Sequence, residues 1–447
     1  MDSKNIMESQ GSKLLIKGGR VLVNRKWEKV DLYIEQGLIK KIGKDLEAGP
    51  KVQVFDGRGK WISPGFVDVH VHLREPGFEH KETIETGTMA AAKGGYTTIF
   101  PMANIRPCPD TEEKMKAYMD LIKKKARVNV IPYSPITSGE QGATLVDMEA
   151  MIKLGVSHFS DDGVGVSDDN VMRAAMEQCS KLNKAENSLE LSRKKPMIVA
   201  HTEDMKYREK GAALHQGEYT KKLGIKGIPS ICETSQLQRD LKLALETKAP
   251  YHVCHLSAKE SVAALKRAKE QGGDVSGEVT PHHLLLEDVQ VKDTNWKMNP
   301  PLRSREDRLA LIDGLKEGVI DFIATDHAPH TEEEKALDIE HAPFGIVGLE
   351  TAFALLYTEL VRKQEIFSVE ELVALMSEKP AARFGLADRG VIKVGNQADL
   401  VILDLDKQWI INKEQFLSKG KNTPFEGMTV FGEVVATFVG GVKVYEE

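Results

Sequence analysis

The stretch Gly65-Phe-Val-Asp-Val-His-Val-His-Leu-Arg-Glu-Pro-Gly77 decides how the rest of the chain is interpreted. Valines alternate in it with Asp68, His70 and His72, which is the period of a β-strand whose polar side chains share one face. Two imidazoles side by side on a strand can hold a divalent metal ion. Two histidines satisfied by hydrogen bonds would give the same pattern, so this stretch alone leaves both interpretations open.

Strand-like and helical segments alternate on both sides of this stretch, between residues 64 and 385. Apolar runs bounded by turn residues predict eight strands, at 66–73, 96–103, 128–136, 156–161, 197–202, 251–257, 275–281 and 321–326. Amphipathic segments predict helices between them, at 82–93, 111–125, 145–154, 168–182, 232–245, 259–270 and 305–315. Eight such units in a row are typical of a closed parallel (β/α)8 barrel, the TIM barrel.

The two ends of the chain have a different character. Short β runs separated by glycines fill residues 13–62, and β runs return after residue 385. We therefore predict an α/β protein in which residues 64–385 form the barrel. Residues 1–63 and 386–447 are predicted to form one small β-sandwich from both termini. The polar segment 183–196 predicts a surface extension of the barrel.

Composition excludes several classes of protein. Of the 447 residues, 41% are hydrophobic and 29% are charged, as in soluble globular proteins. A net charge of −6 gives no basic footprint for nucleic acid, and no run of about 18 apolar residues predicts a membrane span. The first ten residues lack the apolar core of a signal peptide. Four cysteines without a CxxC pair predict free thiols in the cytoplasm.

The candidate site residues lie where the predicted barrel strands end, which is the active end of this fold. The strand ends carry His70, His72 and Arg74, then Asn104, Asp161 and Asp162, His201, His255, Asp326 and His330. Singly, His201 or His255 would more often be a packed core residue, and each aspartate a turn or cap. Their shared placement favours one site.

The donor set indicates the kind of metal. Four histidines and two carboxylates are ligands of zinc-like divalent ions. Six ligands are too many for one tetrahedral zinc with an open position, but they suit two ions bridged by a carboxylate. The strand pattern does not choose between Asp161 and Asp162 as the bridge.

Longer motifs carry these residues in a familiar order. They are Asp-Val-His-Val-His-Leu-Arg-Glu-Pro-Gly at 68–77, Asp-Asp-Gly at 161–163, His-Thr-Glu at 201–203, Cys-His-Leu at 254–256, Asn-Pro-Pro-Leu-Arg at 299–303 and Ala-Thr-Asp-His-Ala-Pro-His at 324–330. The chain thereby resembles the dihydroorotases of the bacterial type I branch, within the cyclic amidohydrolase superfamily. One motif departs from the family, because Met102-Ala-Asn-Ile105 stands where Met-Pro-Asn-Thr is usual.

The resemblance implies a role for each site residue. His70, His72 and Asp326 would hold one Zn²⁺, His201 and His255 a second, and Asp162 would bridge them in place of the carboxylated lysine of other members. Asp326 would also be the catalytic base. The residues implied in substrate binding are His72, Arg74, Asn104, Asn299, His330, Phe344 and Gly345.

The implied activity is the reversible, zinc-dependent cyclisation of N-carbamoyl-L-aspartate to dihydroorotate, the third step of pyrimidine synthesis. The resemblance also implies a homodimer that can associate with aspartate carbamoyltransferase. Two alternatives are another cyclic amidase, such as an allantoinase or hydantoinase, and a non-catalytic scaffold paralogue. The acidic segment 331–345 is either a lid over the site or a solvated surface helix.

Overall fold

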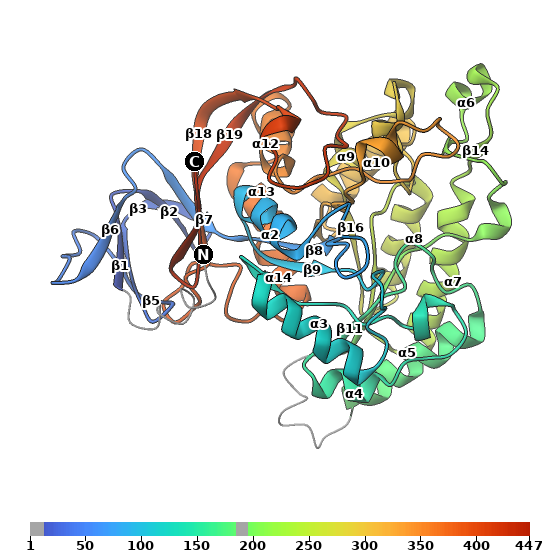
Figure 1. Cartoon of the computed structure of the whole chain (residues 1–447), viewed down its shortest axis with the longest axis horizontal. Coiled ribbons are helices and arrows are strands. Elements are labelled where there is room, and N and C mark those ends of the chain that lie inside the picture. The colour runs from blue at the N-terminus through green and yellow to red at the C-terminus, as the bar shows by residue number, and fades with distance from the viewer. Residues whose placement is uncertain (1–12, 185–194) are drawn as a thin grey trace.

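The computed structural model describes residues 13–184 and 195–447, and its centre is a closed barrel of eight parallel strands (Figure 1). The strands are β8 (Phe66–Val71), β9 (Tyr96–Pro101), β10 (Asn129–Val130), β11 (His158–Phe159), β12 (Met197–Ala200), β15 (Tyr251–Val253), β16 (Val275–Val279) and β17 (Phe322–Ile323). Two isolated parallel bridges, Ser134 to Phe159 and Val71 to His327, join the two sheets and close the barrel. All eight predicted strand positions are confirmed.

Several of these strands are shorter than the sequence predicts. The third was expected over 128–136, but regular pairing covers only Asn129–Val130. Pro132 and Pro135 follow, and neither has an N–H to continue the ladder. Tyr133 still donates its N–H to the Pro101 carbonyl at 3.1 Å, so the chain keeps its course between the neighbouring strands.

Helices cover the outside of the barrel at the predicted places. They are α2 (Ile84–Lys93), α3 (Glu112–Lys125), α4 (Met148–Lys153), α5 (Asp169–Lys184), α7 (Ile231–Thr247), α8 (Lys259–Glu270) and α10 (Arg305–Lys316). Thr83, Thr111 and Ser304 cap three of them with side-chain oxygens, which satisfies backbone N–H groups of the first turn. The segment 204–230 contains a small subdomain made of β13 (Leu214–His215), α6 (Glu218–Leu223) and β14 (Gly227–Ile228).

One end of the barrel is closed by an aromatic plug. Phe384 follows α14 (Glu378–Arg383), and its ring lies 4.8 Å from that of His158 and 6.1 Å from that of Phe322. His158 and Phe322 each begin a strand, so the plug fills the N-terminal end. The opposite end, where the strands finish, is left for polar side chains.

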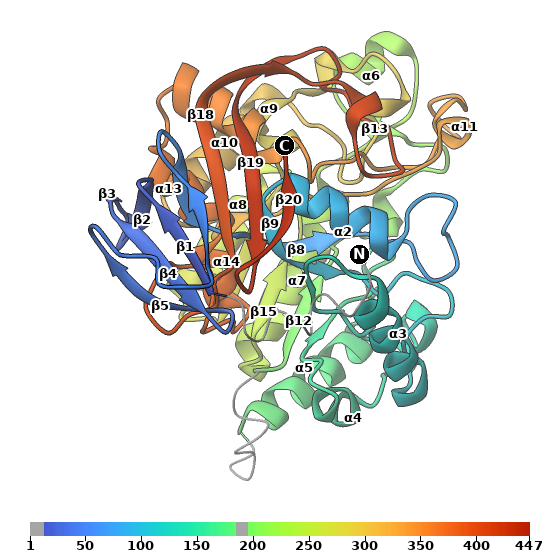
Figure 2. The same ribbon diagram turned by 60° about the vertical axis from the view of Figure 1, so that its left-hand side comes forward.

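Both chain ends join in a small β-sandwich beside the barrel (Figures 1 and 2). One sheet has the order β5 (Leu38–Gly43), β4 (Asp31–Glu35), β1 (Lys13–Lys17), β6 (Val52–Asp56). The other has the order β20 (Val442–Glu446), β19 (Thr429–Val439), β18 (Leu400–Ile410), β7 (Trp61–Pro64), β2 (Arg20–Val23), β3 (Lys26–Lys29). The predicted fold class, a TIM barrel with a β-sandwich from both termini, is confirmed.

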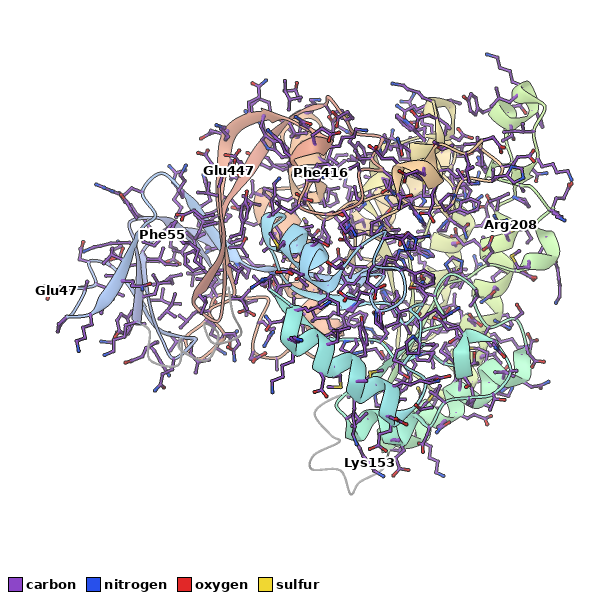
Figure 3. All side chains as sticks on the ribbon, in the orientation of Figure 1. Glu47, Phe55, Lys153, Arg208, Phe416 and Glu447 are labelled. Atoms are coloured by element: carbon purple, nitrogen blue, oxygen red, sulfur yellow. The ribbon has the colours of Figure 1, made fainter. Side chains whose placement is uncertain are left out.

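The sandwich has its own core, built from residues far apart in the chain. Leu32 and Ile62 from the N-terminal part pack in one cluster with Ile402 and Phe438 from the C-terminal part. Figure 3 shows Phe55 and Glu447 in this part of the molecule, and Arg208 on the far side of the barrel. We propose domain boundaries at residues 63/64 and 385/386, because α14 and its Phe384 plug belong to the barrel.

Two other expectations concern a surface extension and membrane-spanning segments. The predicted extension at 183–196 lies for the most part outside the described residues, which stop at Lys184 and resume at Lys195. Among the helices of the described ranges, none is both long and apolar enough to cross a membrane.

Candidate metal centre

Six side chains from five strand ends meet at the open end of the barrel. His70 and His72 come from β8 and its continuation, and Asp162 follows β11. His201, His255 and Asp326 follow β12, β15 and β17 in the same way. All six are at least nine-tenths buried. The structure therefore brings together every residue that the sequence predicted as a metal ligand.

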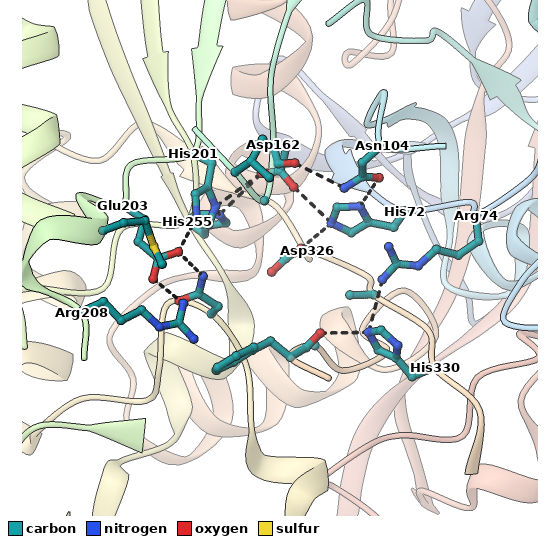
Figure 4. Close-up of a pocket in the computed structure, with 17 residues that line it drawn as sticks. His72, Arg74, Asn104, Asp162, His201, Glu203, Arg208, His255, Asp326 and His330 are labelled. Carbon is teal, nitrogen blue, oxygen red and sulfur yellow. Dashed lines mark hydrogen bonds and ion pairs between the residues drawn. The ribbon is translucent and has the colours of Figure 1, made fainter. Parts of the chain in front are cut away.

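Asp162 lies at the middle of this cluster (Figure 4). Its Oδ1 is 3.4 Å from His70 Nε2, 3.7 Å from His201 Nδ1 and 3.8 Å from His255 Nε2. Its Oδ2 is 3.5 Å from His72 Nε2. One carboxylate thus faces two histidine pairs, which is the arrangement needed to bridge two ions.

The cluster fits metal ions better than it fits internal hydrogen bonds. His70 Nε2 and Asp162 Oδ1 are buried and have no hydrogen-bond partner among the described residues, although such atoms are nearly always paired in proteins. Two of the triads in this cluster have donor atoms that all lie within 4.8 Å of one another. One is His70, His72 and Asp162, and the other is Asp162, His201 and His255. Imidazole nitrogens and carboxylate oxygens at this spacing suit zinc-like ions.

Asp161, the alternative bridge, has a different environment. Its Oδ1 accepts hydrogen bonds from the backbone N–H groups of Ile136 at 2.7 Å and Thr137 at 3.0 Å. Its Oδ2 accepts one from the Thr137 hydroxyl. The side chain holds the preceding strand end in place and does not face the histidines.

Three site residues have strained backbones. Arg74, His255 and Asp326 all have positive φ angles, of 61°, 32° and 50°. Residues other than glycine rarely adopt this conformation, and where they do, the surrounding structure holds them there, often at functional sites. Here the strain turns each side chain from the end of its strand into the pocket.

Two carboxylates beneath the cluster support it, and sequence reasoning missed both: Glu278 orients the His70 ring, whereas Asp68 binds the backbone of His70 and the side chain of Thr325. Glu278 in β16 accepts from His70 Nδ1 at 2.7 Å and from His252 Nε2 at 3.1 Å. Asp68 accepts from the Thr325 hydroxyl at 2.6 Å and from the His70 N–H at 3.1 Å. A charged residue inside an apolar strand was the available signal, because an unpaired buried carboxylate is costly.

The local electrostatics favour the ionised forms of two carboxylates, Glu278 and Asp326. Burial opposes ionisation of Glu278, yet its hydrogen bonds from His252 and His70 lower its pKa to about 2. Burial likewise opposes ionisation of Asp326, but the charge of His70 and a hydrogen bond from His72 hold its pKa below the usual range. Asp326 is therefore held in its ionised form.

One wall of the pocket is positively charged. Arg74 is held by the Pro329 carbonyl, to which its Nε donates at 3.3 Å, and its Nη2 lies 3.4 Å from His330 Nε2. His330 donates in turn to the Phe344 carbonyl at 2.9 Å. Burial and the neighbouring Arg74 lower the pKa of His330, so that it stays neutral beside the guanidinium.

The other predicted substrate residues also reach this pocket. It has a volume of about 410 Å³, and Arg74, Asn104, Asn299, His330, Phe344 and Gly345 all line it. Asn104 accepts from His72 Nδ1 at 3.2 Å, so it keeps its place although alanine replaces the proline that the family usually has before it.

The opposite wall contains the acidic residue Glu203, which sequence reasoning did not select as a site residue (Figure 4). Glu203 Oε1 accepts from Arg208 at 2.6 Å, and its Oε2 accepts from Asn299 Nδ2 at 2.9 Å. His201 Nε2 lies 3.4 Å from the same Oε2. No local sequence signal reveals the contact with Asn299, because it joins the fifth strand end to a loop almost a hundred residues away.

The segment 331–345 begins with the short helix α11 (Glu332–Lys335) and ends at the pocket. Two buried lysines hold it. Lys335 donates to the carbonyls of Pro343 and Gly345 at 3.0 Å, and Lys297 donates to that of Ala342 at 2.6 Å. A Cβ on Gly345 would lie 2.6 Å from that of Ala328, so only glycine fits this close approach.

Comparison with known proteins identifies the family. Residues 59–261 match the family described as dihydro-orotase-like, and residues 315–445 match the amidohydrolase family. The dihydroorotase of Bacillus cytotoxicus is 51% identical over 437 residues, which is 97% of this chain and 98% of that protein. The dihydroorotase of Bacillus thuringiensis is 50% identical with the same coverage. The chain belongs to the dihydroorotase family.

Solved structures place this family member in the wider superfamily. The L-hydantoinase of Arthrobacter aurescens superposes with a TM-score of 0.83 at 26% identity, covering 97% of this chain and 96% of that one. The D-hydantoinase of Thermus sp. gives 0.81 at 27% identity, with 96% and 94% covered. The chain is thus a cyclic amide hydrolase of the amidohydrolase superfamily, and the predicted resemblance is confirmed.

Proposed function

We propose that this family member interconverts dihydroorotate and N-carbamoyl-L-aspartate, the ring-forming step of pyrimidine synthesis. The observation that carries the proposal is the pairing of the metal-binding cluster with the Arg74 wall in one pocket. A cyclic amide with a carboxylate on its ring matches both halves. Half of the residues are identical to proteins named dihydroorotase, whereas the hydantoinases share about a quarter.

We assign the metal ligands as the family resemblance implies them. His70, His72 and Asp326 would hold one ion, His201 and His255 the other, and Asp162 would bridge them. Imidazole and carboxylate donors favour Zn²⁺. Bound in this way, the ions would lower the pKa of a water molecule so that it attacks as hydroxide, and would polarise the amide carbonyl.

The protein's own groups have three tasks in this mechanism. Arg74, with Asn104 and His330 beside it, would hold the substrate carboxylate through a two-pronged, charge-assisted hydrogen bond. His72 would border the substrate as well as bind metal. Asp326 would accept the proton of the attacking water and deliver it to the ring nitrogen as the C–N bond breaks. Ring closure would use the same groups in reverse.

The wall opposite Arg74 and the 331–345 segment border the rest of the pocket. Asn299 and the backbone of Phe344 and Gly345 would read the amide edge of the ring, and the segment would act as a lid that excludes water. The complete donor set speaks against a non-catalytic scaffold. We further propose a cytoplasmic homodimer, able to associate with aspartate carbamoyltransferase; the four buried, unpaired cysteines agree with a reducing compartment.

A substrate panel tests this proposal. The purified protein, loaded with zinc, is offered dihydroorotate, hydantoin and allantoin under the same conditions. We expect kcat/KM for dihydroorotate to exceed that for the other two at least a hundred-fold, about 3 kcal/mol of transition-state binding, because only dihydroorotate gives Arg74 a carboxylate. Preference for hydantoin or allantoin would contradict the proposal and favour the alternative cyclic amidase.

A further inference from the structure

The wall opposite Arg74 is organised by one carboxylate, that of Glu203. Its side chain is 8% exposed, and both oxygens are engaged. Oε1 accepts from Arg208 Nη1 at 2.6 Å, while Oε2 accepts from Asn299 Nδ2 at 2.9 Å. Both oxygens of Glu203 therefore act as hydrogen-bond acceptors, one for the Arg208 guanidinium and the other for the Asn299 amide.

This contact determines which end of the Asn299 amide faces the pocket. An asparagine amide has a donor NH₂ on one side and an acceptor oxygen on the other. Because Glu203 is an acceptor, Asn299 must turn its NH₂ towards Glu203. The carbonyl oxygen Oδ1 then faces the cavity, which Asn299 and Glu203 both line.

We propose that Glu203 is a positioning residue for specificity, which makes Asn299 present a hydrogen-bond acceptor to the substrate. The pocket would thereby select a ring that carries an N–H at that edge, as cyclic amides and ureides do, and reject one with an acceptor there. The inference rests on the proposed function for its substrate. It goes beyond that function by assigning a task to Glu203 and Arg208, neither of which has one in the proposed mechanism.

Arg208 is the second part of this device. It donates to Glu203, and its guanidinium lies 4.7 Å from the centre of the Phe344 ring, so it ties the wall to the end of the 331–345 segment. It also donates to the Ala212 carbonyl at 3.3 Å. These contacts fix the Glu203 oxygen that faces Arg208, and therefore leave only the other oxygen to Asn299.

The variant E203Q tests the claim. Its side-chain amide has one oxygen, which Arg208 would retain, so its NH₂ would face Asn299. Asn299 would then have to reverse, and its own NH₂ would point into the pocket at the substrate N–H. We expect KM for dihydroorotate to rise about ten-fold or more, with a smaller change in kcat, because one hydrogen bond is replaced by two opposed donors.

The double variant E203Q/R208M distinguishes amide orientation from general damage. Without Arg208, the introduced amide can rotate its oxygen towards Asn299, so KM should return to within about three-fold of R208M alone. The matched control is E209Q on the same loop, where Glu209 is 66% exposed and KM should not change. An equal rise in KM with and without Arg208, or no rise in E203Q, would overturn the inference.

Metal content separates this role from one that acts through His201. Zinc per subunit should stay at the wild-type value in E203Q; loss of zinc with a fall in kcat would instead show that Glu203 supports the metal ligand, and would overturn the proposal.

If E203Q does not fold, wild-type protein is tested with 1-methyl- and 3-methyl-dihydroorotate as competitive inhibitors. One of them should bind about ten-fold or more weakly than dihydroorotate, and equal binding of all three would contradict the claim. Wild-type protein that fails to hydrolyse dihydroorotate would refute the proposed function itself, whatever the variants do.

Discussion

At the scale of single residues, Asp161 and Asp162 are chain neighbours with separate tasks. Asp162 faces four histidine nitrogens, whereas Asp161 satisfies two backbone N–H groups and a hydroxyl. The strand period alone could not assign these roles, because both residues lie past the regular end of β11, which stops at Phe159.

This difference predicts opposite outcomes for two alanine variants. D162A should lose at least half of the bound zinc while keeping its fold, because it removes the shared ligand. D161A should keep the wild-type zinc content but lose about 2–4 kcal/mol of unfolding free energy, since it leaves buried donors unsatisfied. Elemental analysis and urea unfolding measure the two effects. Equal loss of zinc in both variants would refute the assignment of Asp162.

In the proposed mechanism, Arg74 supplies the specificity for a carboxylate. R74K keeps the charge but loses the fork that binds both carboxylate oxygens, so we expect KM for dihydroorotate to rise about ten-fold or more with zinc content unchanged. Steady-state kinetics and elemental analysis provide the test. R173K, a change at an arginine that is 41% exposed, is the control. A wild-type KM in R74K would remove Arg74 from substrate binding.

At the scale of elements, the segment 331–345 depends on lysines that the sequence gives no reason to bury. Lysine is nearly always exposed, so a pattern-based reading places Lys335 in a solvated helix. In the structure Lys335 is 5% exposed and donates to backbone carbonyls. Burial, with repulsion from Lys297, lowers its pKa to about 7.

This burial predicts a pH-dependent stability. Between pH 7 and the ordinary lysine pKa, the unfolded chain holds a proton that folded Lys335 has released, so the free energy of unfolding rises with pH. K335M removes this contribution. The difference in unfolding free energy, wild type minus K335M, should increase by about 2 kcal/mol from pH 7 to pH 9.

Urea unfolding at the two pH values measures this difference. K363M, at a lysine whose side chain is 57% exposed, is the control and should behave as the wild type at both. A difference between wild type and K335M that does not change with pH would show that Lys335 is not held in a shifted state.

At the scale of the whole molecule, local patterns were enough for the architecture. Each barrel strand was predicted from an apolar run, and six of the eight end in polar candidate residues. Because strand ends in this fold share one rim, the six predicted ligands could be grouped without knowing any distance. The two halves of the sandwich were joined by inference, and the packing of Ile62 with Ile402 supports it.

What could not be predicted depends on contacts between distant loops. Glu203 meets Asn299 across 96 positions of sequence, and the orientation of that amide follows only from the contact. Glu278 supports His70 across 208 positions. Contacts of this kind leave no periodic pattern in the sequence, whereas the metal ligands follow recognisable strand patterns.

We propose that one barrel rim holds both a metal-dependent hydrolytic site and a site for the substrate carboxylate. The most direct test follows the hydrolysis of dihydroorotate by ultraviolet absorbance before chelation, after chelation, and after zinc is restored. We predict activity in the untreated protein, loss of at least 90% after chelation, and recovery with zinc, because the attacking water would need the metal. Undiminished hydrolysis in chelated, demonstrably zinc-free protein, or no hydrolysis in zinc-loaded protein, would contradict the account.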